Sequence, residues 1–270
     1  MALRALRFGI SRHHGGLQLV AGARRFAEAL AGSLKIPVKL TVAPDYDKLL
    51  EGVLIGGIEV AWMPPLLHAR AVSEGALLAA VSERAGGLAY RSALLVKDSS
   101  VYRAVADLKG ARAAWADRSS ASGYLFPRLH LQATGLDPRR DLQSEKFLGS
   151  PALACAAVAG GEADLCACYI SDGAGGDPAR ALAEVRGTVG DAGASLRVLD
   201  ATDPIPPDGM VLAAPLDGWE QAKVRDALLN LHARSAGAEA IRDLLHAERL
   251  APVTDEVVQL MARLKRYARV

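Results

Sequence analysis

The sequence predicts an α/β protein built as two lobes with a helical C-terminal tail. Strand-like and helix-like segments alternate from the N-terminus onward, and a second alternating block follows at about residues 98–195. Helical spacing of apolar residues then runs from Trp219 to the C-terminus. Alternation of this kind is typical of mostly parallel sheets flanked by helices. We therefore expect residues 1–95 and 200–270 to form lobe 1, and residues 96–199 to form lobe 2, with a ligand cleft between them.

The first block predicts strand, helix, strand, helix and strand in that order. Period-two alternation indicates the second strand, and Asp45 is a favourable N-cap for the helix that follows it. Pro64 and Pro65 are expected to stop the third strand. The expected strands are residues 6–10, 37–42 and 58–63, and the expected helices are residues 17–34 and 45–54.

The second block and the tail follow from the same signals. Ser150 and Pro151 form a good N-cap and first-turn pair for one helix, and a proline-rich turn near residues 204–207 separates the last two strands. The expected strands are residues 76–81, 88–96, 111–116, 146–148, 163–169, 195–199 and 210–213, and the expected helices are residues 124–134 and 151–158 with further helices in the tail.

Composition excludes several classes of protein. Lys and Arg total 32 against 30 Asp and Glu, so the near-balanced charge argues against a general nucleic-acid binder. A hydrophobic fraction of 51% excludes disorder as the main state. No apolar run reaches the ~18 residues of a membrane span, so no membrane insertion is expected. Residues 1–11 lack an export signal, which predicts a cytoplasmic location as the sequence stands, or a periplasmic one if a signal was trimmed.

The three cysteines are Cys155, Cys166 and Cys168. Cys166 and Cys168 alternate with apolar residues in an expected strand, which favours buried thiols. A disulfide between Cys155 and one of the pair, or a metal site, remains an alternative. The sequence has no P-loop, no H-E-x-x-H and no G-x-G-x-x-G after a strand, so we expect no cofactor and no metal.

The sharpest local feature is the serine-rich stretch SSASGY at residues 119–124. It follows an expected strand and opens an expected helix. Free backbone N–H groups at a helix start, together with serine hydroxyls and the helix dipole, can bind an anion. A tetrahedral oxyanion suits such a turn because it offers several acceptors to several donors. Simple N-capping by one serine is the alternative.

At this point the sequence resembles the substrate-binding proteins of phosphate, phosphite and phosphonate ABC transporters. The resemblance rests on DLKGARAAWADRSSASGYLFP at residues 107–127, IEVAWMPP at residues 58–65, and Asp203–Pro206, in the family's order. It covers about residues 5–235 and implies the type 2 periplasmic-binding-protein fold. Departures from the family pattern include Ala121 in place of threonine, so we expect a smaller oxyanion than aminoethylphosphonate, or a different ligand.

The resemblance also implies binding residues. Ser120, Ala121 and Ser122 occupy the turn that binds the oxyanion in that family, and Tyr46 and Tyr90 match tyrosines of its cleft. The remaining candidates are open between ligand contact and a structural role, in the core or on an exposed loop. They are Arg12 with His13 and His14, Trp62 and Tyr169. Ser11, at the end of the first strand, falls where the first lobe of that family contributes contacts, and Met63 is a further expected ligand contact.

The resemblance implies a monomeric, non-catalytic binding protein. It would serve as the solute-binding component of an ABC transporter, with the permease as partner, or as a related sensor. The alternative is a cytoplasmic enzyme on the same fold, similar to enzymes of menaquinone or thiamine-pyrimidine synthesis and acting on a small organic acid. Against that alternative, the sequence lacks G-x-S-x-G, and no histidine lies next to the serine turn in sequence.

Overall fold

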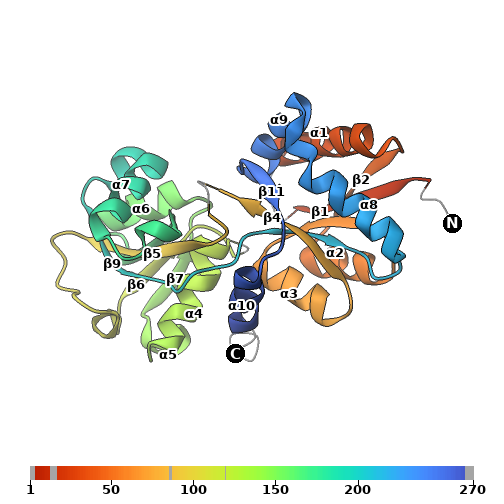
Figure 1. The fold of residues 1–270 in the computed structure, drawn as a ribbon. Helices are drawn as coiled ribbons and strands as arrows, with labels where there is room; N and C mark the ends of the chain where they lie inside the picture. The colour runs from red at the N-terminus through yellow and green to blue at the C-terminus, as the bar shows by residue number, and fades with distance from the viewer. Residues whose placement is uncertain (1–3, 13–16, 85–86, 119, 265–270) are drawn as a thin grey trace. The chain divides into compact units, whose positions relative to one another are not determined.

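The computed structural model describes residues 4–12, 17–84, 87–118 and 120–264 (Figure 1). The chain folds into two compact α/β units, and each is described by itself. Unit 1 is Met1–Leu88 with Pro206–Val270, and unit 2 is Ala89–Ile205. Each unit has its own sheet, which confirms the α/β class that the alternating pattern predicts. None of the helices in the described ranges is long and apolar enough to span a membrane.

The sheet of unit 1 is mixed rather than mostly parallel. Its strand order is β11-β4-β10-β3-β1-β2, with β1 parallel to β2 and β3, and β10 antiparallel to β3 and β4. Local periodicity predicts that a strand exists but not its direction, which depends on where the chain re-enters the sheet. The strands are β1 (Leu6–Ser11), β2 (Val38–Ala43), β3 (Val60–Met63), β4 (Leu77–Glu83), β10 (Gly209–Leu212) and β11 (Arg249–Ala251).

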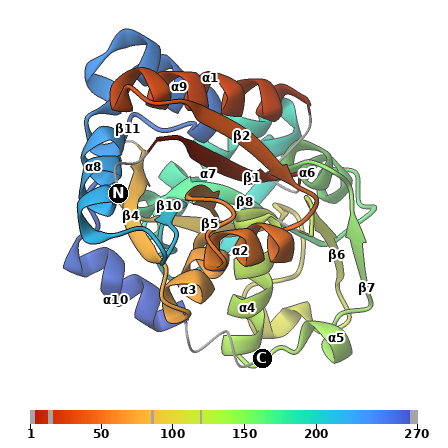
Figure 2. The same cartoon turned by 90° about the vertical axis from the view of Figure 1, so that its right-hand side faces the viewer.

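Helices cover both faces of this sheet. Strand alternation sends Val60 and Trp62 to one face, under α1, α8 and α9, and sends Ala61 and Met63 to the other, under α2, α3 and α10. Figure 2 shows α1 and α9 side by side, with α2 across the sheet from them. The helices are α1 (Leu17–Leu34), α2 (Tyr46–Leu54), α3 (Pro65–Ser73), α8 (Gly218–Leu229), α9 (Ser235–Leu245) and α10 (Asp255–Leu264).

The sheet of unit 2 is also mixed, in the order β7-β6-β8-β5-β9. Strand β6 is parallel to β7 and β8, whereas β5 is antiparallel to β8 and β9. Strand β5, most of which the sequence prediction assigned to lobe 1, thus pairs inside unit 2. The strands are β5 (Tyr90–Lys97), β6 (Arg112–Trp115), β7 (Ser144–Phe147), β8 (Leu165–Ser171) and β9 (Leu196–Ala201).

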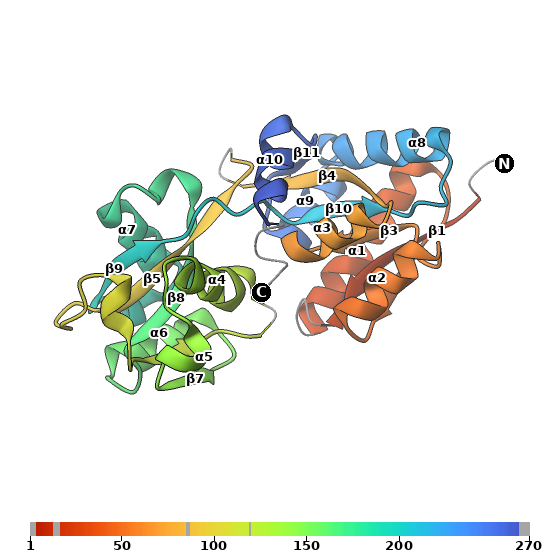
Figure 3. The same ribbon diagram turned by 90° about the horizontal axis from the view of Figure 1, so that it is seen from below.

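Two apolar clusters fill the space on either side of this second sheet. One contains α6 and α7, and the other contains α4 with Trp115 and Leu131 at its centre. Figures 1 and 3 show α6 and α7 within this unit, with α4 and α5 near β7. The helices are α4 (Phe126–Ala133), α5 (Pro138–Asp141), α6 (Pro151–Ala159) and α7 (Pro178–Val189), with the short turns η2 (Val105–Leu108), η4 (Asp172–Ala174) and η5 (Gly190–Gly193).

Several segments differ from the sequence expectation. Pro65 begins helix α3 rather than only ending a strand, because proline is well tolerated at the first helical position. Helix α7 and strand β11 have no counterpart among the expected elements. The helix expected at residues 124–134 starts as a single π-helical turn, η3 (Ala121–Leu125), before α4 continues it.

Candidate functional site

The carboxyl edge of the second sheet positions most of the candidate residues of unit 2. Strands β6, β7 and β8 are parallel, so their carboxyl ends meet at the same edge. The serine turn, which we define as Ser120–Ser122, follows β6, and Tyr169 lies near the end of β8. Tyr90 begins the antiparallel strand β5 and therefore lies at this edge too. Ligands of open α/β sheets are typically bound at such an edge.

Ser120 caps the helix that the serine turn opens. Its Oγ accepts a hydrogen bond from the backbone N–H of Gly123 at 3.0 Å, and its carbonyl accepts one from Leu125 at 3.0 Å. The first N–H groups of a helix have no acceptor within the helix. Ser120 Oγ satisfies that of Gly123. Among the residues that the structure describes, no hydrogen bond occupies the N–H groups of Ala121 and Ser122, which are therefore available to a ligand.

Gly123 allows the turn to fold back onto strand β6. Its carbonyl accepts a hydrogen bond from the backbone N–H of Ala116 at 3.2 Å. A Cβ at this position would lie 2.7 Å from the Cβ of Ala116 and 2.7 Å from Ser120 Oγ. The Cβ of Ala116 cannot move aside without moving the backbone, and Ser120 Oγ can move only by rotating about χ1 and losing its hydrogen bond to Gly123. The approach of the turn to the strand therefore requires glycine.

Ser92 fixes the serine turn to strand β5. Its Oγ donates a hydrogen bond to the carbonyl of Ser122 at 2.6 Å and lies 3.4 Å from the carbonyl oxygen of Cys168. Its backbone N–H donates to Thr202 Oγ1 at 3.0 Å. Ser92 is 0% exposed and is one of few polar residues in the core. Ser92 is not among the residues predicted from the sequence, although a serine inside the apolar run of β5 was an available signal.

Replacement of Ser92 by alanine should weaken both the fold and the turn. The carbonyl of Ser122 would lose its buried donor, which typically costs about 1–3 kcal/mol of unfolding free energy. We expect a reduced urea midpoint together with weaker oxyanion affinity. The conservative variant Ser92→Thr, which keeps the hydroxyl, should recover part of the affinity. If Ser92→Ala bound oxyanions as tightly as the wild type, Ser92 would have no role in positioning the turn.

Two tyrosines lie together at the carboxyl edge of the second sheet. The rings of Tyr90 and Tyr169 stack with their centroids 5.4 Å apart and an interplanar angle of 28°. Tyr169 lies directly across from Ser92 in the register of β5 and β8, so the tyrosine pair and the anchored turn occupy neighbouring positions. Tyr90 is 6% exposed and Tyr169 is half-buried. Both candidates from the sequence therefore lie close together in unit 2.

The acidic residue just beyond β8 has a cationic partner. Arg91 Nε donates to Asp172 Oδ1 at 2.7 Å, and its Nη1 donates to the carbonyl of Thr202 at 2.9 Å. The arginine thus balances the charge of Asp172 and links the ends of strands β8 and β9. The edge that carries the serine turn gains no net negative charge from this pair, which suits an anionic ligand.

The candidates of unit 1 gather at the carboxyl edge of its own sheet. Strands β1, β2 and β3 are parallel, with Ser11 beside Ala43 in the register. Ser11 ends β1 and is fully buried, Arg12 follows it and is exposed, and Tyr46 is the first residue of α2. Asp45 caps α2 as the sequence predicts, with its Oδ1 accepting the N–H of Lys48 at 2.7 Å.

Trp62 and Met63 belong to the core of unit 1. Trp62 is 7% exposed within the cluster under α1, and Met63 is fully buried within the cluster under α2 and α3. For Trp62, whose place the sequence left open between core and cleft wall, this burial favours the core. His13, His14 and Ser119, which the sequence also singled out, lie outside the described residues.

Comparison with known proteins agrees with this architecture. XAC2383 from Xanthomonas citri, solved with ATP, superposes with a TM-score of 0.78 at 17% identity, covering 99% of each chain. A binding protein component of a phosphonate ABC transporter from Pseudomonas aeruginosa gives a TM-score of 0.71 at 20% identity, covering 99% of this chain and 87% of that one. PhnD1 from Prochlorococcus marinus (MIT 9301), solved with methylphosphonate, gives 0.70 at 16% identity, covering 98% of each chain.

These structures confirm the type 2 periplasmic-binding-protein fold that the resemblance implies. The comparison with family models identifies the family as well as the fold. Residues 8–258 match the model of a family described as the periplasmic phosphonate substrate-binding protein of ABC transporters. Nothing in these matches supports the enzyme alternative. The chain therefore belongs to the family of phosphonate substrate-binding proteins of ABC transporters.

Proposed function

We propose that this protein binds a small oxyanion of the phosphate, phosphite or phosphonate class without transforming it, with the serine turn as the main oxyanion contact. The observation that carries this proposal is the anchored turn itself. Ser92 holds the turn through the carbonyl of Ser122, and Gly123 allows the turn to lie against β6. The N–H groups of Ala121 and Ser122 remain as donors at a helix start.

The serine hydroxyls add donors to those N–H groups. Ser120 Oγ already accepts from Gly123, which leaves its O–H proton to donate elsewhere. Within the described part of the chain, no hydrogen bond occupies Ser122 Oγ. A tetrahedral oxyanion can accept from several such donors at once, and hydrogen bonds to a charged acceptor are about twice as strong as neutral ones.

Further ligand contacts are proposed at two other places. Tyr90 and Tyr169 would contact the substituent of the oxyanion, because their stacked rings lie beside the turn. Ser11, Arg12 and Tyr46 at the carboxyl edge of the first sheet are the proposed contacts of unit 1. Exchange of Arg12 for Gln and of Tyr46 for Phe, each measured with the same ligands, tests these contributions separately.

As a family member, the protein is also proposed to deliver its ligand to an ABC-transporter permease. Absence of catalysis is part of the proposal. Incubation of the protein with methylphosphonate, followed by phosphorus NMR, should return the ligand unchanged at stoichiometric protein concentration. Release of inorganic phosphate, abolished by a variant of the serine turn, would contradict it.

The experiment that tests the function is a thermal-shift series. The ligands are phosphate, phosphite, methylphosphonate, 2-aminoethylphosphonate, sulfate and small carboxylates. A ligand present at about 1,000 times its dissociation constant adds about 4 kcal/mol to the apparent stability, which is a large melting shift. We expect shifts with phosphorus oxyanions and little with carboxylates. Absence of a shift with all phosphorus oxyanions would overturn the proposed ligand class.

Single substitutions then locate the site. Ser120→Ala and Ser122→Ala should each weaken binding by roughly 1.5–3 kcal/mol, the scale of a hydrogen bond to a charged group. Isothermal titration calorimetry measures the affinity, and the melting temperature of the unliganded protein should change little for Ser122→Ala. Ser99→Ala, an exposed serine elsewhere in unit 2, is the matched control. Equal affinities for all three variants would place the oxyanion elsewhere.

A further inference from the structure

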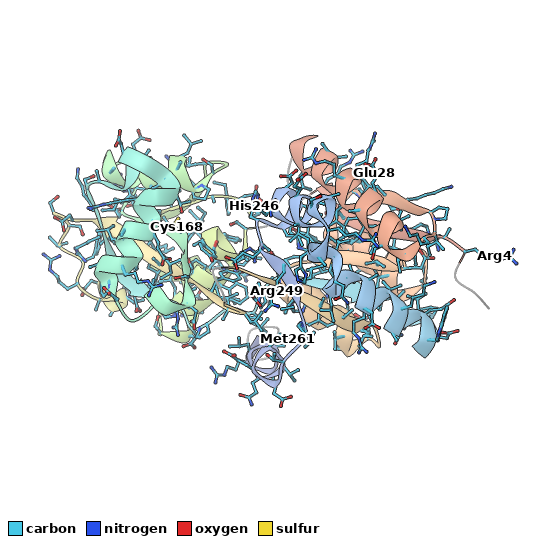
Figure 4. The ribbon with its side chains drawn as sticks, turned by 45° about the horizontal axis from the view of Figure 1, so that its top comes forward. Arg4, Glu28, Cys168, His246, Arg249 and Met261 are labelled. Atoms are coloured by element: carbon cyan, nitrogen blue, oxygen red, sulfur yellow. The ribbon has the colours of Figure 1, made fainter. Side chains whose placement is uncertain are left out.

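Two of the three cysteines are in direct contact inside unit 2. Cys166 Sγ lies 3.7 Å from Cys155 Sγ, and both residues are 0% exposed. Cys155 lies on helix α6, and Cys166 lies at the start of the neighbouring strand β8. Figure 4 marks Cys168, on the same strand, within this unit. Helix α6 begins after its N-cap Ser150 at the carboxyl edge of the second sheet, and strand β8 carries Tyr169 near the same edge. The contact therefore joins two elements that both reach this edge.

We propose that Cys155 and Cys166 are a disulfide-forming pair that links helix α6 covalently to strand β8. Two sulfurs at 3.7 Å are in van der Waals contact, and side-chain rotation must bring them to a bonded length of about 2 Å. The link closes a short loop between residues 155 and 166 and joins elements that already pack together in one apolar cluster.

Cys168 is not the partner in this pair. It shares the face of β8 with Cys166 and lies two strand positions further on, about 6.6 Å along the strand. Side chains at such positions point in the same direction rather than toward each other, which disfavours a Cys166–Cys168 bond. The described residues contain no group of three His, Cys, Asp or Glu side chains that could hold a metal ion, so a shared metal is not the reason for the contact.

The reaction requires an oxidant, which we take to be a disulfide compound such as oxidised glutathione. The thiolate of one cysteine of the pair attacks one sulfur of the oxidant, forms a mixed disulfide and releases one thiol. The thiolate of the other cysteine then attacks the protein sulfur of that mixed disulfide and releases the second thiol. The two protein thiols lose two electrons to the oxidant, and their two protons leave on the released thiols.

In the folded protein the contact makes the two thiols unequal in acidity. The hydrogen bond from Cys166 lowers the pKa of the Cys155 thiol, and burial opposes this effect. The hydrogen bond to Cys155 and burial both raise the pKa of the Cys166 thiol. Because both sulfurs are fully buried, a bulky oxidant reaches them while unit 2 folds or opens locally, not in the closed native state.

Thiol counting after oxidative refolding tests the pair. The reduced, unfolded full chain is refolded with oxidised and reduced glutathione, denatured again, labelled with maleimide and weighed. We expect one label on the wild type, none on Cys168→Ala and two on Cys155→Ala. Three labels on the wild type, or a stable glutathione adduct in place of the internal bond, would overturn the proposal.

Peptide mapping identifies the bond itself. Glu162 lies between Cys155 and Cys166, so a glutamate-specific protease separates the two cysteines. The two fragments of the oxidised wild type should stay joined until a reductant is added. Cys166→Ala should give separate fragments, whereas fragments that remain joined through Cys168 would contradict the assigned pair. The melting temperature of the oxidised wild type should fall on reduction, and that of Cys155→Ala should not.

Discussion

Replacement of Gly123 by alanine should weaken oxyanion binding by more than about 100-fold. The added Cβ would lie 2.7 Å from both the Cβ of Ala116 and Ser120 Oγ, so the turn must move away from strand β6. That movement displaces the N–H groups of Ala121 and Ser122 together with the capping hydroxyl. Loss of two hydrogen bonds to a charged ligand, at about 1.5–3 kcal/mol each, gives this fold-change.

The same substitution should lower the unfolding free energy by about 1–3 kcal/mol, the usual cost of overpacking. Calorimetric titration with phosphate or methylphosphonate, together with urea unfolding, measures both effects. Gly187→Ala in helix α7 is the matched control, because its Cβ would meet no atom within 4 Å. The control should keep the ligand affinity and gain slightly in stability. Wild-type affinity in Gly123→Ala would remove the serine turn from the binding site.

Acid should destabilise unit 1 through His68. This histidine of α3 is 0% exposed, and burial is the main cause that lowers its pKa to about 4. The carbonyl of Pro207, 3.1 Å from Nε2, and the carboxylate of Asp208 act in the opposite direction, toward a higher pKa. The ring is therefore neutral in the folded protein near pH 7, with Nε2–H donating a hydrogen bond to the Pro207 carbonyl.

The sign of the pH effect follows from proton uptake. The ordinary pKa of 6.5 applies to His68 in the unfolded chain, so between pH 6.5 and 4 the unfolded state binds more protons. Stability is complete above pH 6.5 and falls as the pH decreases toward 4. At 1.36 kcal/mol per pKa unit, the loss from this one group is roughly 3 kcal/mol.

Urea unfolding between pH 7.5 and 4 measures this loss. His68→Gln keeps an N–H donor for the Pro207 carbonyl but does not titrate. The difference in unfolding free energy between wild type and variant therefore reports the titration of His68 separately from that of the carboxylates. We expect the curves to diverge below pH 6.5, with the variant losing less stability. The same comparison with His246→Asn, a surface histidine, controls for the loss of an imidazole. Parallel curves for wild type and His68→Gln would show that His68 carries no acid sensitivity.

Local sequence signals predicted most of the elements and the central motif. The helix at residues 17–34 has the predicted bounds, and the Asp45 and Ser150 caps form as expected. These features depend on periodicity and on hydrogen bonds within a few residues, which a sequence displays directly. The serine turn is local in the same sense, because its cap joins Ser120 to Gly123.

The proposed binding residues were only partly predictable from the sequence. Tyr90 and Tyr169 lie 79 positions apart along the chain but stack because β5 and β8 pair in the register that brings their ends together. Ser92 is 30 positions from the carbonyl that it anchors. No local sequence pattern identifies such distant partners. A serine in an apolar strand indicates only that a buried hydroxyl needs a hydrogen-bond partner.

The sequence alone therefore determined the α/β class, the positions of most strands and helices, the family resemblance and the serine turn proposed to bind the oxyanion. The tertiary structure decided the antiparallel entry of β5 and β10, the start of α3 at Pro65, the anchoring of the turn by Ser92, and the contact between Cys155 and Cys166. The physical reason is the range of the interactions. Helical periodicity and capping act over three to four residues, whereas strand direction, buried hydrogen bonds and sulfur contacts depend on which distant segments share a core.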